Sequence, residues 1–156
     1  MSEKIKLENK VEIRNRKASH EYHFMDSFIA GLVLKGTEIK SIRQQKVNMQ
    51  DAWCLIENDK VIVKNMHISA YEKGSWLNHN PMRDRILLLR KNEIKKIDKK
   101  LLDQGTTLIP IRLFISERGF AKMEIVLAKG KKLFDKREDL REKDLKREAN
   151  KTSLDW

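Results

Sequence analysis

The most regular alternation of apolar and polar positions lies between residues 109 and 127. In its first half, every second position is apolar, at Ile109, Ile111, Leu113 and Ile115. A turn at 117–119 leads into a return run from Phe120, in which one face carries Ala121, Met123, Ile125 and Leu127. This period of two predicts a hairpin of two strands. Proline has no N–H to donate, so Pro110 places its strand at a sheet edge or at a bulge.

Shorter apolar runs predict further strands earlier in the chain. Asp26-Ser27 is typical of a turn or a short helix start, and Asn58-Asp59 is typical of a hairpin tip. A loop follows from Asn65 to Pro81, and the apolar run at 85–89 is compatible with a strand or with the start of a helix. The predicted extended runs are residues 20–24, 30–34, 52–56 and 61–63.

Two segments have the spacing of amphipathic helices. Thr37 is a suitable N-cap, and Ile39 and Ile42 share one side while Lys40, Ser41 and Arg43 lie mostly off it. The second predicted helix is capped by Asn92, exits at Gly105 and aligns Ile94, Ile97 and Leu101 on one face. Each helix therefore has one side for a core and one for solvent or a ligand.

Several short strands with two interleaved helices in about 120 residues predict a mainly β protein. We expect a small antiparallel barrel of the oligonucleotide-binding (OB) type with embedded helices rather than βαβ units. Residues 1–10 are expected to be a flexible arm, 11–128 the barrel and 129–156 a basic C-terminal tail.

Charge points to a polyanionic partner. The 156 residues include 34 lysines and arginines against 23 acids, a formal charge of +11. Such a field attracts nucleic acid or anionic lipid, but no bulky apolar face accompanies the basic runs, which argues against a membrane surface. No run approaches the roughly 20 apolar residues of a spanning helix. The N-terminus has no apolar signal core, which favours a cytoplasmic protein.

The segment after Leu127 differs in composition from the rest. Leu140 and Leu145 are five apart and form no stripe for docking on a core. Acid-before-base pairs support a helix by about 0.2–0.5 kcal/mol each, too little for an isolated segment. We therefore expect the tail to be disordered when free and helical in an anionic groove. A merely solubilising tail is the alternative.

Catalytic and metal chemistry find little support. The single cysteine and four histidines lack the spacing of a zinc site, and phosphate-cradle and nucleophile-elbow motifs are missing. A metal-free nuclease using His20 and His67 is conceivable. Binding is better represented: Tyr22, His20 and His67 are candidates to stack on bases, and Trp53 and Phe120 are assigned to packing. The candidate phosphate contacts are Asn15, Arg16, Lys40, Arg43 and Lys122.

A series of motifs resembles one known family, small protein B, the SsrA-binding proteins of bacterial trans-translation. The match opens with Asn15-Arg16-Lys17-Ala18-Ser19-His20-Glu21-Tyr22. It continues in order through most of residues 11–140. The further matching segments are 34–43, 48–52, 65–68, 79–85, 87–89, 105–107, 128–132 and 135–137.

The resemblance implies an OB-like barrel that binds the tRNA-like domain of transfer-messenger RNA (tmRNA), without cofactor, metal or covalent chemistry. It implies that the tail enters the decoding centre and the empty mRNA channel of a stalled ribosome, and that elongation factor Tu joins through the RNA. The implied RNA-binding residues are Asn15, Arg16, His20, Tyr22, Lys40, Ser41, Arg43, Asn65, Leu88 and Lys122, with Leu88 shaping the face. The implied tail residues are Lys129, Gly130, Lys131, Lys132, Asp135, Lys136 and Arg137.

Three positions depart from the family pattern. Ile29 stands where an acid is familiar, Gln45 where a glycine is usual, and Asn80 where an Asp is usual. Two other functions remain open from the residues themselves. One is a ribosomal or initiation-type barrel protein without a rescue role, and the other is a small RNA-processing enzyme.

Overall fold

The computed structural model describes residues 11–131 together with Arg141, Leu145 and Arg147, which are helical. The helices are α2 (Arg16–Glu21), α3 (Gly36–Arg43) and α4 (Lys91–Leu101), with a 3-10 turn η1 (Ser75–Leu77). The strands are β1 (Glu12–Arg14), β2 (Tyr22–Leu32), β3 (Val47–Asn48), β4 (Trp53–Glu57), β5 (Lys60–Lys64), β6 (His67–Ile68), β7 (Arg85–Leu88), β8 (Thr106–Ile115) and β9 (Ala121–Gly130). The predicted arm, 1–10, and most of the predicted tail lie outside the described residues.

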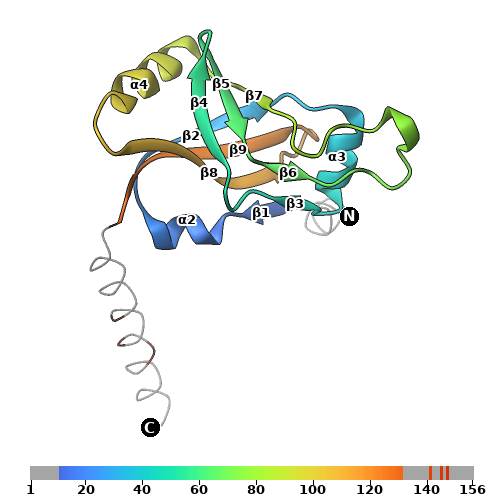
Figure 1. The fold of residues 1–156 in the computed structure, drawn as a ribbon, viewed down its shortest axis with the longest axis horizontal. Coiled ribbons are helices and arrows are strands. Elements are labelled where there is room, and N and C mark those ends of the chain that lie inside the picture. Colours follow the sequence, from blue (N-terminus) through green and yellow to red (C-terminus); the bar gives the residue numbers. More distant parts are fainter. Residues whose placement is uncertain (1–10, 132–140, 142–144, 146, 148–156) are drawn as a thin grey trace.

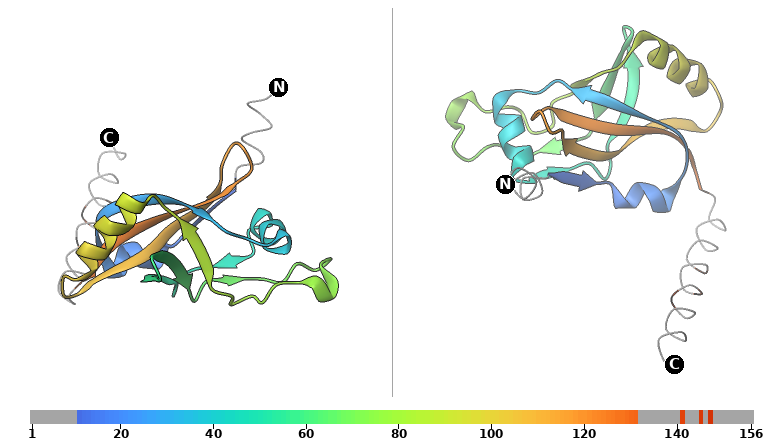
Figure 2. Two further views of the ribbon diagram at one scale, coloured as in Figure 1. Left: turned by 90° about the horizontal axis from the view of Figure 1, so that it is seen from above. Right: turned by 180° about the vertical axis from the view of Figure 1, so that it is seen from behind.

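The strands form a mainly antiparallel sheet that closes into a ring. Its order is β1-β8-β4-β5-β7-β2-β9, and β8 also pairs with β9, which joins the two ends. A separate two-stranded ladder joins β3 to β6, so the predicted loop from Asn65 to Pro81 contains a short strand. In Figures 1 and 2, α3 and α4 lie at opposite ends of the ring. The prediction of a mainly β antiparallel fold with embedded helices is confirmed.

The ring encloses the main core. Inward-facing side chains come from every long strand, and α4 contributes Ile97 and α3 contributes Ile42. None of these two isoleucines' surface is exposed to solvent. Burial of apolar surface is the dominant favourable term in folding. The fully buried apolar residues of the strands in this core are Ala30, Val61, Val63, Ile68, Leu108, Leu113, Met123, Ile125 and Leu127.

A bulge in β8 corrects the predicted single-face alternation of Ile109, Ile111, Leu113 and Ile115. Pro110 pairs with Ile125 and Arg112 with Glu124, so Ile111 is the extra residue. An extra residue in a strand moves every later odd-numbered side chain to the opposite face of the sheet. Ile109 and Ile111 therefore point away from the main core, whereas Leu113 and Ile115 point into it. Of the two placements predicted for Pro110, the bulge is confirmed.

The segment 16–32 differs from its prediction. His20 and Glu21 end the short helix α2, and β2 then continues from Tyr22 to Leu32. Asp26-Ser27 is neither a turn nor a helix start, because the β2–β9 register shifts between Phe24 and Ser27. Met25 and Asp26 lie together opposite Leu127 in a bulge, so the strand continues through Asp26-Ser27 without ending.

Both predicted helices exist, but each begins earlier than expected. The N-caps are Lys35 and Arg90 rather than Thr37 and Asn92. In each case the acid three residues into the helix accepts a hydrogen bond from the cap's backbone N–H, Glu38 from Lys35 and Glu93 from Arg90. Each glutamate thus satisfies the backbone N–H of the residue before its helix, which is one half of a capping box, while the Lys35 and Arg90 side chains have no acceptor for the other half.

Residues other than glycine adopt left-handed backbone conformations at the β4–β5 hairpin and at the turn after α3. The predicted β4–β5 hairpin is confirmed, with Asn58 at φ 51° and Asp59 at φ 60°, as its two-residue turn requires. Gln45, where the family pattern has glycine, adopts φ 59°. The turn is therefore kept, with a side chain in a conformation that favours glycine.

The apolar run at 85–89, compatible by its sequence with a strand or with the start of a helix, forms strand β7.

Gly105→Ala is expected to destabilise the protein relative to Gly36→Ala. Gly105 has φ +81°, which an L side chain adopts at a cost of about 1–2 kcal/mol. Gly36 has ordinary φ and open space around it. Both changes restrict the unfolded chain alike, so the difference in urea midpoints measures backbone strain. Equal midpoints would contradict it.

Candidate nucleic-acid interface

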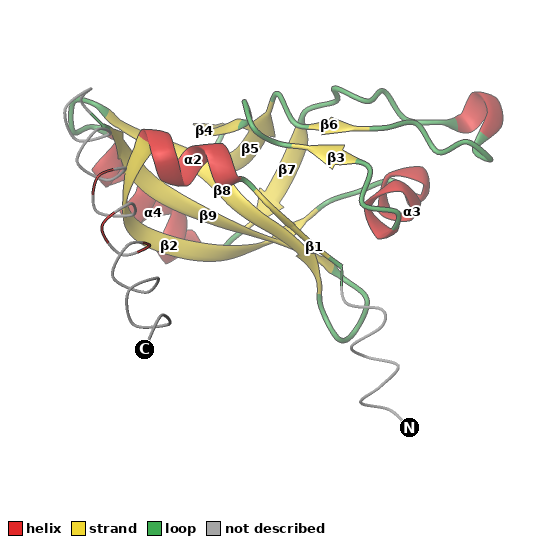
Figure 3. Cartoon of the chain, turned by 90° about the horizontal axis from the view of Figure 1, so that it is seen from below, coloured by secondary structure: helices red, strands yellow, loops and turns green. Residues whose placement is uncertain are grey.

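The short helix α2 lies over one end of the sheet surface that is turned away from the core (Figure 3). This surface is called the outer face here, and the part that α2 leaves uncovered is called its open half. The reversal in β8 points Ile109 and Ile111 outward, where they meet Val126 and Ala128 of β9. Ala18 of α2 and the ring of Tyr22 pack on these side chains. The second apolar cluster thus fixes α2 on the outer face.

Asn15 locks α2 in place from within the protein. Its Oδ1 accepts a hydrogen bond from the Ala18 N–H at 3.2 Å. Its Nδ2 donates to the carbonyl oxygens of Met49 and Pro110, both at 3.0 Å. The residue is only 5% exposed. Its amide is therefore occupied by the backbone, and it positions Arg16 and His20 rather than reaching a ligand.

The open half of the outer face combines apolar side chains with a lysine. Gly31 of β2 lies in register with Leu88 of β7 and Lys122 of β9. A Cβ atom at Gly31 would stand 3.5 Å from that of Leu88 and 3.8 Å from the Lys122 Nζ. Leu88 is 60% exposed, and among the described residues no carboxylate pairs with Lys122. The glycine thus leaves a shallow surface between an apolar and a cationic group.

Neighbouring side chains extend this apolar surface. Ile29 lies two residues before Gly31 in β2, Val33 directly follows that strand, and Phe120 precedes β9. Their exposed fractions are 49%, 42% and 62%. The assignment of Phe120 to packing is therefore wrong, and Trp53, at 39%, is also partly exposed. Phe120 is exposed because it lies in the turn before β9, which the core does not reach.

The helix α3 adds cationic groups next to this face. Lys40 and Arg43 are exposed, and the Arg43 guanidinium lies 3.7 Å from where a Cβ of Gly119 would stand, next to Phe120. Ser41 is fully buried beside Glu38 and Ile42. Its predicted place off the apolar side is wrong, since the buried face of α3 includes polar residues. Ser41 does not reach the surface.

A buried ion cluster attaches α3 to the chain around β7. Glu38 is fully buried and accepts hydrogen bonds from Arg85 Nε and, at 2.5 Å, from Arg83. Arg85 is also fully buried and donates to the Met66 and Pro81 carbonyls. Burial acts to raise the pKa of Glu38, but hydrogen bonds from Arg83, the Lys35 N–H and Arg85 together hold that pKa below its ordinary value.

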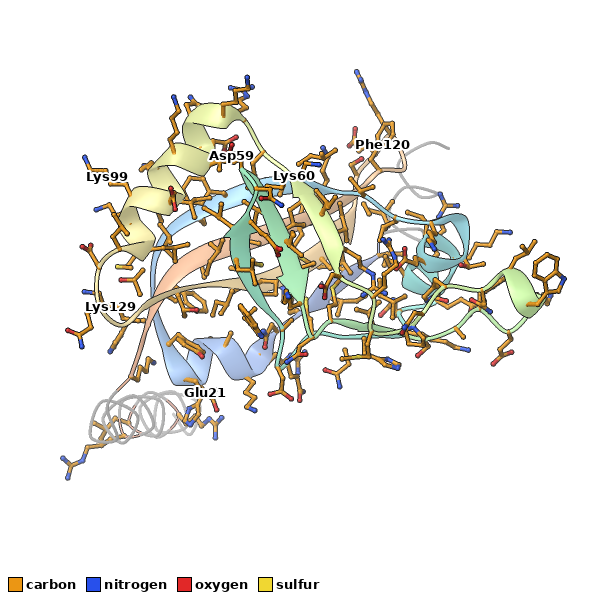
Figure 4. The ribbon with its side chains drawn as sticks, turned by 45° about the horizontal axis from the view of Figure 1, so that its top comes forward. Glu21, Asp59, Lys60, Lys99, Phe120 and Lys129 are labelled. Atoms are coloured by element: carbon orange, nitrogen blue, oxygen red, sulfur yellow. The ribbon has the colours of Figure 1, made fainter. Side chains whose placement is uncertain are left out.

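The first tail residues lie against α2. Gly130 pairs with Tyr22, and Lys129 with His23. The Lys131 N–H donates to the Glu21 carbonyl at 2.8 Å, and its Nζ donates to the Ser19 carbonyl at 3.2 Å. Figure 4 labels Glu21 and Lys129 at the same end of the molecule. The predicted tail residues Lys132, Asp135, Lys136 and Arg137 lie outside the described residues.

Asn65 lies away from the open half of the outer face. It borders a hollow of about 290 Å³ with Asn48, Asp51, His67 and Met82. A second hollow, of about 260 Å³, lies between α2 and β4 and also includes Asp51, Glu21 and Tyr22. The two hollows share Asp51, so Asn65 is connected to the α2 side. Asn80 Oδ1 accepts from the Met82 N–H at 3.0 Å, as an Asp would.

The structure thus sorts the ten predicted RNA-binding residues into groups. Those near the open outer face are Arg43, Leu88 and Lys122, while Lys40 of α3 lies over the ring of Tyr71. Those at α2 are Arg16, His20 and Tyr22, while Asn65 lies beside β6 and Asn15 and Ser41 are buried. Within the part of the chain that the structure describes, no three His, Cys, Asp or Glu side chains gather as a metal site. None of its helices is long and apolar enough to span a membrane.

Comparison with known proteins gives a consistent family. The family model described as SmpB protein matches residues 12–154. The chain is 52% identical to the SsrA-binding protein of Cytophaga hutchinsonii, over 99% of this chain and 100% of that one. It is 49% identical to the SsrA-binding protein of Caldanaerobacter subterraneus, over 95% and 93%.

A solved structure has the same fold. It is described as "tmRNA-SmpB: a journey to the center of the bacterial ribosome" and matches with a TM-score of 0.68 and 40% identity. The match covers 79% of this chain and 86% of that one. Since both the sequence along nearly its whole length and the strand arrangement agree, the chain belongs to the SmpB family of SsrA-binding proteins.

Proposed function

We propose that this chain grips the tRNA-like domain of tmRNA with its outer face and α3, and places its tail in the decoding centre and empty mRNA channel of a stalled ribosome. As an SmpB family member, it is a tmRNA-binding protein that acts with the ribosome in trans-translation, not an enzyme. The family sets aside the nuclease and the general ribosomal-protein hypotheses.

The observation that carries the proposed RNA contact is the juxtaposition of Lys122, Leu88 and Arg43. An ammonium and a guanidinium without carboxylate partners among the described residues are suited to phosphate oxygens. The apolar surface around Gly31 is suited to riboses and base faces. By contrast, Arg112 on the same sheet is held by Glu124 at 2.9 Å and by Glu12 at 3.5 Å. Its charge is therefore largely neutralised.

The α2 end supports a second part of the proposed contact. Arg16 is exposed, and His20 and Tyr22 lie at the end of α2 and the start of β2. Asn15 and Ser41 enter the proposal as positioning residues, since both are buried. Ile29 replaces the familiar acid with an apolar group, so at this point we propose contact with a ribose or base.

The remaining parts of the proposal follow from the family. We propose that the closed ring of strands is the OB-like barrel, that elongation factor Tu joins through the RNA, and that the complex acts in the cytoplasm. We propose that the tail is disordered when free. Ordering it on binding then costs free energy, so it binds where the channel is empty. Bound messenger competes for that channel, which supports selectivity for stalled ribosomes.

Lys122→Glu is expected to lower affinity for the tRNA-like domain roughly tenfold to a hundredfold, because hydrogen bonds to charged groups contribute about 1.5–3 kcal/mol. The slope of log affinity against log salt should become shallower by about one. Filter binding over a salt series measures both. Lys60→Glu, at the hairpin tip in Figure 4, changes net charge equally and should cost little. Equal losses of affinity in both variants would show that net charge alone, and not the position of Lys122, determines RNA binding.

A further inference from the structure

The tip of the loop between β6 and β7 exposes two large apolar side chains. Trp76 is 87% exposed and Leu77 is 68% exposed, both within η1. Tryptophan is among the residues most buried on average, so an almost fully exposed indole marks a candidate binding group. The outer face and α2, as described above, do not include it.

The loop that carries Trp76 is firmly held at its base. Asn78 Oδ1 accepts from the Tyr71 N–H at 3.0 Å, and its Nδ2 donates to the Tyr71 carbonyl at 2.6 Å. A Cβ at Gly74 would lie 2.7 Å from the same Nδ2, so only glycine fits there without a shift. The two ends of the tip are thereby closed on each other. A preorganised tip loses little conformational entropy on binding.

A second set of contacts joins this loop to α3. His79 is buried, and its ring nitrogens hydrogen-bond Thr37 Oγ1 at 2.8 Å and the Ile68 carbonyl at 2.9 Å. The Lys40 ammonium lies 5.4 Å from the centre of the Tyr71 ring. The tip therefore belongs to the same rigid end of the molecule as the exposed cations of α3.

The surroundings of the tip are cationic. Lys73 is exposed, and Lys40 and Arg43 of α3 lie on the same end. Of the nearby acids, Glu72 is paired with Lys46 at 3.0 Å, and Asp84 with Lys64 at 3.5 Å. An indole with an unneutralised basic rim complements a base attached to phosphates. An apolar pocket in a protein partner would leave those cations unmatched.

We propose that Trp76 is a stacking platform for an unpaired base of the tRNA-like RNA held along α3. The inference rests on the proposed function and adds a contact that lies outside the outer face and α2. Every base has a π-face, so the contact is tolerant of sequence. Leu77 borders the indole and is expected to contribute less, because it has no ring to stack.

A single-tryptophan reporter tests the proposal. The chain has three tryptophans, so Trp53→Phe with Trp156→Phe leaves Trp76 as the sole reporter. Titration with the isolated tRNA-like domain should quench its fluorescence and protect it from acrylamide. In the otherwise natural chain, Trp76→Ala should weaken binding roughly fivefold to a hundredfold. Trp76→Phe should retain most of the affinity, and Leu77→Ala nearly all of it.

The outcomes separate the inference from the proposed function. If filter binding shows saturation while Trp76 fluorescence and acrylamide access stay unchanged, the stacking contact is wrong and the RNA-binding function stands. If neither the natural chain nor the reporter binds the RNA, the proposed function fails together with the inference. A signal that arises only when ribosomes are added without tmRNA assigns the indole to another partner and overturns the proposal. Circular dichroism of Trp76→Ala confirms that the fold is kept.

Discussion

Ending the chain at Lys132 is expected to abolish peptide tagging on stalled ribosomes while leaving affinity for the tRNA-like domain near that of the full chain. The deleted segment, 133–156, contains seven lysines and arginines and seven acids, so the net charge of +11 does not change. The long-range attraction for RNA is therefore preserved, as are the Lys131 contacts with α2. Filter binding and a tagging assay with a message lacking a stop codon measure the two activities.

A matched control distinguishes sequence from mere length. A chain in which 133–156 is scrambled keeps its composition, charge and reach. If the tail has to seat in the decoding centre, this variant should bind RNA and fail in tagging. Tagging by the truncated chain, or a parallel loss of RNA binding and tagging, would contradict the division of work between the folded part and the tail.

Glu38→Gln is expected to lower the free energy of unfolding by roughly 3–5 kcal/mol, a large part of the usual total of about 5–15 kcal/mol. The amide removes the charge that balances Arg85, which is fully buried, and Arg83. An unpaired buried guanidinium is costly. Urea unfolding measures the change. Because the cluster holds α3 beside the loop with Trp76, RNA affinity should fall as well.

The pH dependence of stability gives an independent reading of the same cluster. The folded state holds the pKa of Glu38 below its ordinary value of 4.5. Its contribution is therefore present above the unfolded pKa and is lost as pH falls through the lower, folded pKa. Glu38→Gln should flatten that acid loss. Glu72→Gln breaks an exposed pair with Lys46 and should cost at most about 1 kcal/mol. A natural-like urea midpoint in Glu38→Gln would disprove the cluster's role.

Local patterns predicted the elements whose cause is local. The hairpins β4–β5 and β8–β9 follow from alternation and turn residues near in sequence, and the apolar spacing of Ile94, Ile97 and Leu101 predicted α4. Helix starts were misplaced because Glu38 and Glu93 complete caps that Thr37 and Asn92 only resemble. The short helix α2 was missed because its six residues stand on a cluster formed by distant strands.

The candidate site shows the same limit. Residue type identified Lys122 and Arg43, and the family resemblance added Leu88, but their proximity depends on pairings between β2, β7 and β9 and on the turn at Gly119. Asn15 was predicted as a contact since an amide also suits a phosphate. Its two carbonyl acceptors, 34 and 95 residues away, are not visible in a local pattern. The exposure of Phe120 and Trp76 likewise depends on how far the core extends.

The extra residue at Ile111 has a consequence for how this protein tolerates change. Because of this bulge, β8 has side chains in the core on both sides of Ile111, while Ile109 and Ile111 themselves pack in the cluster under α2. Removing Ile111 would leave Pro110 paired with Ile125 and Arg112 paired with Glu124, so Leu113 would stay in the core and only the outward contact of Ile111 would be lost. A residue added between Arg112 and Leu113 would instead exchange the two faces of the rest of the strand and move Leu113 toward water. At this point β8 therefore tolerates a shorter chain better than a longer one.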